Sequence, residues 1–185
     1  MAGKRTPQRR IVLAALFTAI GVALGRLMAG IPNVELVTLS VFVGGVFCGM
    51  RAGAAIGALV MLVHSLLNPL GPAPPPLLPA QMAGFALAGI AGGFLGRRSR
   101  LAGARGALAA GAAGFAVTLV YDALTTLATA FIALGAGGFA RGVWGVAAAG
   151  LVFAAIHVGV NTALFAVAVP PVVAAGRAAG AGGTA

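Results

Sequence analysis

Long apolar stretches, separated by short polar or Gly/Pro-rich breaks, dominate the chain. Six stretches can be marked, at about residues 11–28, 34–50, 52–67, 77–96, 107–134 and 143–169. A helix needs about 20 consecutive, mostly apolar residues to cross the hydrocarbon core of a bilayer. The pattern therefore predicts an all-α integral membrane protein, a compact bundle of six transmembrane helices.

The breaks carry residues that end helices. Pro32 lies between the first two stretches, and a proline both interrupts a helix and restricts the residue before it. Residues 68–76 contain five prolines and predict a stiff, extended loop. Gly135–Gly138 ends the fifth stretch, and Pro170-Pro171 is expected to stop the sixth.

This reading divides the chain into three parts. We expect a basic cytoplasmic head at 1–10, a single membrane domain at 11–173, and a disordered cytoplasmic tail at 174–185. The first stretch is longer than the apolar region of a signal peptide, so we interpret it as a retained helix.

Composition supports a lipid-facing surface. Hydrophobic residues make up 61% of the 185 positions and charged residues 8%, and the mean hydropathy is +1.08. Soluble domains carry about 25% charged residues because their surface faces water. This chain has too little polar material to coat a water-soluble globule.

The formal charge of +10 follows the breaks and predicts the orientation. With the N-terminus inside and six crossings, ten basic residues lie on the cytoplasmic side: Lys4, Arg5, Arg9, Arg10, Arg51, Arg97, Arg98, Arg100, Arg105 and Arg177. Arg26 and Arg141 lie outside. This split satisfies the positive-inside rule and places both termini in the cytoplasm. The basic residues then meet anionic lipid headgroups, and no nucleic-acid partner is expected.

Polar residues inside the apolar stretches are the candidate site. Asp122 is the only acid in the interior of a predicted helix, and an isolated charge in hydrocarbon costs at least about 2.5–3.5 kcal/mol. Thr118, Thr125, Thr126 and Thr129 lie with Asp122 along one side of the fifth helix, and His157 and Asn161 share one face of the sixth. Asp122 either pairs internally, for example with His157, or contacts a ligand; we favour the ligand because intramembrane acids are usually functional.

A second polar group lies toward the outer ends of the predicted helices. It contains Arg26, Asn33, Glu35, His64, Asn68, Gln81 and Tyr121. Together with Asp122, Thr125, His157 and Asn161, these residues are the predicted substrate-binding set. Alternatives remain open: Arg26 and Glu35 could pair with each other, and a lone histidine such as His64 is more often a core residue than a metal ligand.

Several chemistries are missing from the sequence. It has no P-loop, H-E-x-x-H or G-x-S-x-G motif, and Lys4 is its only lysine. We expect no catalytic residues, metal site or cofactor, and therefore no enzyme. Cys48 is the only cysteine, so an intramolecular disulfide is excluded and a buried, inert thiol is expected.

Small residues on the first stretch complete the pattern. Ala15, Ala19 and Ala23 recur at every fourth position, a spacing that lets helix backbones approach closely in lipid. With so much alanine and glycine, such a stripe more often holds a bundle together than binds a separate subunit.

Several segments together resemble the substrate-binding (S) component of energy-coupling factor (ECF) vitamin transporters. They are the basic head before the Ala15-xxx-Ala19 step, residues 31–39 and 47–57, Asn68-Pro69 before a Pro-rich loop, Gln81-Met82, and residues 157–165 ahead of Pro170. The resemblance covers about residues 10–172.

The resemblance implies a high-affinity binding subunit for a vitamin or related micronutrient in a bacterial or archaeal cytoplasmic membrane. Its partners would be a transmembrane coupling subunit, docking at Ala15, Ala19 and the same stripe at Ala23, and through it two ATPase subunits. Loops around 26–35, 68–76 and 135–142 would cover an outward-facing pocket. A solitary uptake protein without the ATPase module and a non-transporting scaffold subunit remain alternatives.

Overall fold

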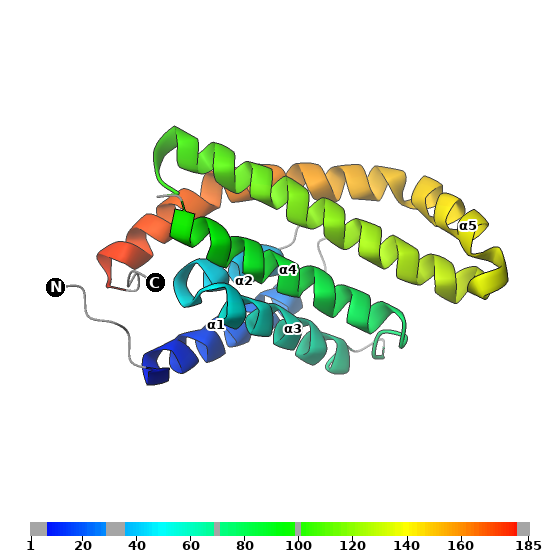
Figure 1. The fold of residues 1–185 in the computed structure, drawn as a ribbon, viewed down its shortest axis with the longest axis horizontal. Coiled ribbons are helices and arrows are strands. Elements are labelled where there is room, and N and C mark those ends of the chain that lie inside the picture. The colour runs from blue at the N-terminus through cyan, green and yellow to red at the C-terminus, as the bar shows by residue number, and fades with distance from the viewer. Residues whose placement is uncertain (1–6, 29–35, 69–70, 99–100, 181–185) are drawn as a thin grey trace.

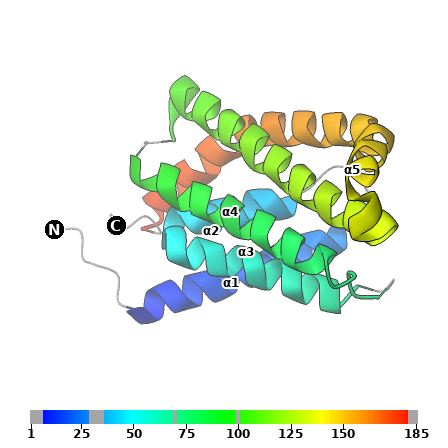
Figure 2. The ribbon, with the colours of Figure 1, turned by 45° about the vertical axis from the view of Figure 1, so that its right-hand side comes forward.

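The computed structural model describes residues 7–28, 36–68, 71–98 and 101–180, and every regular element in these ranges is helical. The elements are α1 (Pro7–Leu27), α2 (Leu36–Cys48), α3 (Met50–Leu66), α4 (Leu77–Arg98) and α5 (Gly103–Ala178). In Figures 1 and 2, α4 lies between the long α5 and the group formed by α1, α2 and α3. The prediction of an all-α fold is confirmed for the described residues.

α5 is folded back on itself and forms a helical hairpin. Its backbone leaves the helical region at Gly135, where φ is 62° and ψ is −170°, a conformation that a residue with a Cβ rarely adopts. The first arm (residues 103–134) and the second arm (residues 136–178) run side by side in opposite directions (Figure 1). These arms correspond to the predicted fifth and sixth stretches. The structure counts five elements, so the six crossings stay a prediction.

Length and composition make this a multi-pass membrane bundle. Residues 8–27 of α1, all of α4 and α5 are long and apolar enough to cross a bilayer, whereas α2 and α3 are shorter apolar helices. The first arm of α5 alone extends about 48 Å at 1.5 Å per residue, which exceeds the roughly 30 Å of a hydrocarbon core. Each arm is therefore long enough to span.

Glycines bring α2, α3 and α4 into backbone contact. A Cβ placed at Gly45 of α2 or at Gly53 of α3 would collide with the carbonyl oxygen of Gly89 in α4. Likewise, a Cβ at Gly57 would strike the backbone of Phe85. Because lipid provides little hydrophobic drive for helices to associate, this close packing is the main attraction available to them. These three helices form the glycine-packed core.

α5 contacts this core through larger side chains. Phe165 of its second arm is fully buried and meets Phe42 of α2, with ring centroids 5.1 Å apart. Gly114 of the first arm leaves room for Phe165, since a Cβ there would lie 2.7 Å from the phenyl ring. The described part of α5 packs against α4 and α2 but not against α1 or α3.

The end of α5 differs from the prediction. Pro170-Pro171 was expected to stop the sixth stretch, yet the helix continues through both prolines to Ala178. Val169 and Val173, on either side of the prolines, are buried in the core. Their burial outweighs the loss of two backbone donors, which membrane helices tolerate when neighbouring groups compensate. The predicted tail therefore begins as helix, while the three-part division of the chain stays a prediction.

One end of the bundle collects both chain ends and most of the described basic residues. The Arg9 side chain donates to the carbonyl oxygen of Gly180 at 2.8 Å, which joins the beginning of α1 to the turn that follows α5. The junction of α2 and α3 lies at the same end, because Arg97 of α4 approaches Gly49. The exposed arginines at this end are Arg9, Arg10, Arg51, Arg97, Arg98, Arg105 and Arg177.

Candidate functional site

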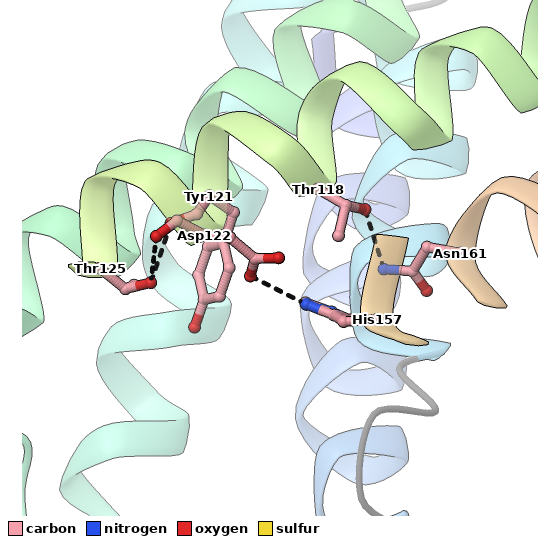
Figure 3. Close-up of polar contacts among 6 residues, drawn as sticks. All are labelled: Thr118, Tyr121, Asp122, Thr125, His157 and Asn161. Atoms are coloured by element: carbon pink, nitrogen blue, oxygen red, sulfur yellow. Dashed lines mark hydrogen bonds and ion pairs between the residues drawn. The ribbon is translucent and has the colours of Figure 1, made fainter. Parts of the chain in front are cut away.

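A carboxylate and an imidazole face each other between the two arms of α5. His157 Nδ1 and Asp122 Oδ1 are 2.9 Å apart, and the side chains are 12% and 19% exposed, respectively. Asp122 lies on the first arm and His157 on the second, so the hairpin at Gly135 is what brings together positions 35 residues apart. Figure 3 shows the pair pointing into the space between the arms.

A second contact lies one helical turn nearer the end of the bundle that holds the chain ends. Asn161 Nδ2 donates to Thr118 Oγ1 at 3.0 Å, and both side chains are buried. Thr118 is four positions before Asp122, and Asn161 is four after His157, so the two contacts form adjacent rungs across the hairpin (Figure 3). Thr118 was not in the predicted binding set. Its spacing of four residues from Asp122, which places both on one side of the helix, was the sequence signal that could have included it.

Two buried oxygen atoms of these rungs have no hydrogen-bond partner. They are Asp122 Oδ2 and Asn161 Oδ1. A buried polar atom without a partner costs about 1–3 kcal/mol, and intramembrane acids are costly in themselves. Among the described residues, the only charged or chargeable side chain that pairs with Asp122 is His157.

Tyr121 places an aromatic surface beside the carboxylate. Its ring meets Phe85 of α4 edge-on at 5.3 Å and His157 edge-on at 6.2 Å between centroids. Gly84 leaves space for the ring, because a Cβ there would approach Tyr121 Cδ2 to 2.7 Å. Thr125, by contrast, directs its hydroxyl to the carbonyl oxygens of Tyr121 and Asp122 on its own helix. Phe85 was not foreseen, since its role depends on packing between helices.

The other predicted binding residues lie elsewhere or outside the described ranges. The Arg26 guanidinium, at the end of α1, donates to the carbonyl oxygen of Leu67. His64 packs against Gly25 of α1, and its buried Nδ1 has no hydrogen-bond partner. Asn68 follows α3, and its carbonyl oxygen accepts from Gly71 at 3.0 Å. Gln81 is partly buried in the first turns of α4. Asn33 and Glu35 lie outside the described residues.

The structure therefore brings together five of the eleven predicted residues: Tyr121, Asp122, Thr125, His157 and Asn161. Arg26, His64 and Asn68 belong to the junction of α1 and α3. No group of three or more His, Cys, Asp or Glu side chains that could hold a metal ion occurs within the described ranges. Cys48 is buried, as expected.

A separate apolar groove runs along the outside of α1 and α3. It has a volume of about 710 Å³, and its walls include Ala15, Ala19 and Ala23 from α1 and Ala55 and Leu59 from α3. Thr18 is the one hydroxyl-bearing residue of its lining, and that hydroxyl already donates to the carbonyl oxygen of Ala14. The predicted docking stripe thus lines a hollow on the lipid-facing side, formed by small side chains.

These features define a class of protein: a helical membrane bundle with apolar outer faces and an intramembrane polar site. A family model described as "ECF transporter, substrate-specific component" matches residues 9–173. The chain belongs to this family, and the resemblance noted from the sequence is confirmed. Comparisons with curated proteins and with solved structures gave no match.

Family membership settles the broad class of activity. The protein is a substrate-specific membrane component of a transporter, and such components bind cargo rather than catalyse a reaction. The expectation that the chain is not an enzyme is thereby confirmed. The cargo, the partner subunits and the membrane orientation are matters of proposal.

Proposed function

We propose that the protein is the high-affinity binding subunit for uptake of a vitamin or related micronutrient, energised by a separate ECF coupling subunit and its ATPases. The observation that carries this proposal is the Asp122–His157 pair between the arms of α5, with the unpartnered Asp122 Oδ2 beside it. A purely structural pair would gain by satisfying both carboxylate oxygens. An oxygen without a partner, next to partly exposed side chains, suits a site that a ligand completes.

The proposed binding set has a centre and a periphery. Asp122, His157, Asn161, Tyr121 and Thr125 form the centre. Arg26, Asn33, Glu35, His64, Asn68 and Gln81 would contribute from the outer side, near the segments that connect α1 with α2 and α3 with α4. This arrangement favours cargo entering from the outer side and reaching Asp122 from there.

The charge distribution supports the proposed orientation. The bundle end that holds Arg9 and Gly180 carries most of the described arginines, whereas Arg26 and Arg141 lie toward the opposite end. By the positive-inside rule, the arginine-rich end faces the cytoplasm. Both chain ends would then be cytoplasmic, in the cytoplasmic membrane of a bacterium or archaeon.

The groove along α1 and α3 supports the proposed partner. The alanines at 15, 19 and 23 keep one wall shallow, so that a helix of the coupling subunit can approach the α1 backbone closely. The chain has no nucleotide-binding motif of its own, so energy from ATP must come through such a partner.

The direct test is to purify the full-length protein gently from its native membranes and identify what accompanies it by mass spectrometry. The proposal predicts one bound small molecule in near-stoichiometric amount, together with a transmembrane subunit and ATPase subunits. A small molecule without those subunits would favour a solitary uptake protein. Partner proteins with no small molecule, and no uptake, would contradict the proposal and favour a scaffold subunit.

A further inference from the structure

The buried polar atoms that have no partner between the α5 arms are of one chemical kind. Each rung already has one side-chain contact, since Asn161 Nδ2 donates to Thr118 Oγ1 and His157 Nδ1 meets Asp122 Oδ1. The two buried atoms without partners, Asp122 Oδ2 and Asn161 Oδ1, are both hydrogen-bond acceptors. A ligand that satisfies them must bring hydrogen atoms on nitrogen or oxygen.

The placement of these acceptors limits the shape of the ligand. They belong to adjacent rungs, which are about 6 Å apart along the helix axis. The Asp122 side chain is 19% exposed, although its Oδ2 is itself buried, and Asn161 is fully buried. A ligand therefore meets the Asp122 side chain before it meets Asn161. The rings of Tyr121, His157 and Phe85 form a chain of edge-on contacts next to it. A flat ring with a donor-bearing edge fits such surroundings.

The charge of the site points in the same direction. No arginine or lysine among the described residues pairs with Asp122, and Arg26 is engaged with the Leu67 carbonyl at the end of α1. A carboxylate or phosphate group of a ligand would face the Asp122 carboxylate without a cation between them. In a low-dielectric site such repulsion is strong, so an acidic group of the cargo must point away from this position.

Resting on the proposed function, we infer that the cargo presents to Asp122 and Asn161 a neutral or cationic edge with at least two N–H donors, as on an amino-substituted nitrogen heterocycle. Asp122 Oδ2 accepts the first hydrogen bond. Asn161 Oδ1 is the second acceptor, one turn deeper, and the Tyr121 ring borders the plane of the ligand. His157 holds the carboxylate through Oδ1, so that Oδ2 stays directed to the cargo.

Three flat test compounds separate this inference from its alternatives. The full-length protein in lipid nanodiscs is titrated with 2,4-diaminopyrimidine, with 2,4-dimethoxypyrimidine, which has the same ring and no N–H, and with benzoate, a flat anion. We expect the diamino compound to bind at least about tenfold more tightly than the other two. Equal binding of the diamino and dimethoxy compounds, or tighter binding of benzoate, would overturn the inference.

Two variants locate the effect. Asp122→Asn replaces one acceptor by an amide donor, and we expect it to weaken binding of 2,4-diaminopyrimidine at least about tenfold. Thr162→Val is the matched control, because the Thr162 hydroxyl donates to Val158 on its own helix at 2.7 Å; it should bind like the wild type. Unchanged affinity in a folded Asp122→Asn protein would overturn the inference. If that variant does not fold, the comparison of compounds on the wild type still decides.

The molecule retained by the wild type distinguishes the two levels of the argument. A retained molecule that does not compete with 2,4-diaminopyrimidine, or that has no N–H donor, overturns the ligand class and leaves the proposed function standing. A protein that retains no small molecule and binds none of the three compounds contradicts both.

Discussion

The glycine-packed core of α2, α3 and α4 and the hairpin of α5 are held together in opposite ways. In the core, backbone meets backbone, and glycines such as Gly45, Gly53 and Gly89 leave no room even for a methyl group. In the hairpin, the arms are joined by polar side chains, Asp122 to His157 and Thr118 to Asn161. The hairpin keeps two buried acceptors without partners, whereas the one such buried atom of the core helices within the described residues, His64 Nδ1, lies near the end of α3 against α1. The difference suggests that the core provides rigidity and the hairpin provides recognition.

The largest expected effect breaks the core. Gly89→Ala should prevent normal assembly, because its Cβ would strike the backbone of Gly53 and neither helix can retreat without losing other contacts. We expect a loss of about 3 kcal/mol of stability, at the upper end of the usual cost of overpacking, measured by thermal unfolding in detergent. Gly150→Ala is the control, since nothing lies within 4 Å of a Cβ there. Equal stability of the two variants would refute the account of the core.

The next effect separates docking from recognition. Ala19→Trp should fill the groove between α1 and α3 and reduce cellular uptake of the co-purifying small molecule at least about tenfold, while the purified protein still binds it. Blocking a helix from close approach is enough to remove the contact. Ala148→Trp, at another exposed position, should leave uptake intact. If uptake survives Ala19→Trp, the groove is not the docking surface.

A change at the hairpin should weaken ligand binding and leave the stability of the bundle largely unchanged. Asp122→Ala should weaken binding of the co-purifying molecule by about ten- to a hundredfold, because it removes a charged acceptor. The bundle should remain folded, since the glycine contacts are untouched. Parallel ligand titration and thermal unfolding measure both quantities. Unchanged affinity would remove Asp122 from the binding site and leave it as a helix-pairing residue.

The smallest expected effect tests the buried rung. Thr118→Val removes the acceptor of Asn161 Nδ2 with little change in shape, so that a second atom of Asn161 is left without a partner. We expect a loss of about 1–2 kcal/mol, seen as a lower unfolding temperature than that of Thr162→Val. Thr118 and Thr162 variants of identical stability would show that the rung contributes nothing to the pairing of the arms.

The sequence predicted the parts of the molecule that depend on local chemistry. Apolar length located the helices, the break at Gly135 fell where Gly135–Gly138 was expected to end a stretch, and the spacing of His157 and Asn161 placed them on one face. The pairing of Asp122 with His157 was one of the two alternatives considered from the sequence, because an intramembrane acid needs a nearby polar group.

What the sequence could not give depends on contacts between distant elements. The continuation of α5 past Pro170 is determined by the burial of Val169 and Val173, which no local rule reveals. The engagement of Arg26 with the Leu67 carbonyl likewise follows from how α1 meets α3. The structure places Arg26, His64 and Asn68 at the junction of α1 and α3 and adds Thr118 and Phe85 beside the hairpin residues. The binding set itself stays a prediction.

An experimental structure of the protein with its co-purified small molecule tests the central claim most directly. The account predicts that the molecule lies between the α5 arms and the outer ends of α1–α4, with a donor atom within hydrogen-bonding distance of Asp122 Oδ2. Bound density away from the α5 hairpin, with Asp122 and His157 unchanged and enclosed by protein alone, would contradict it.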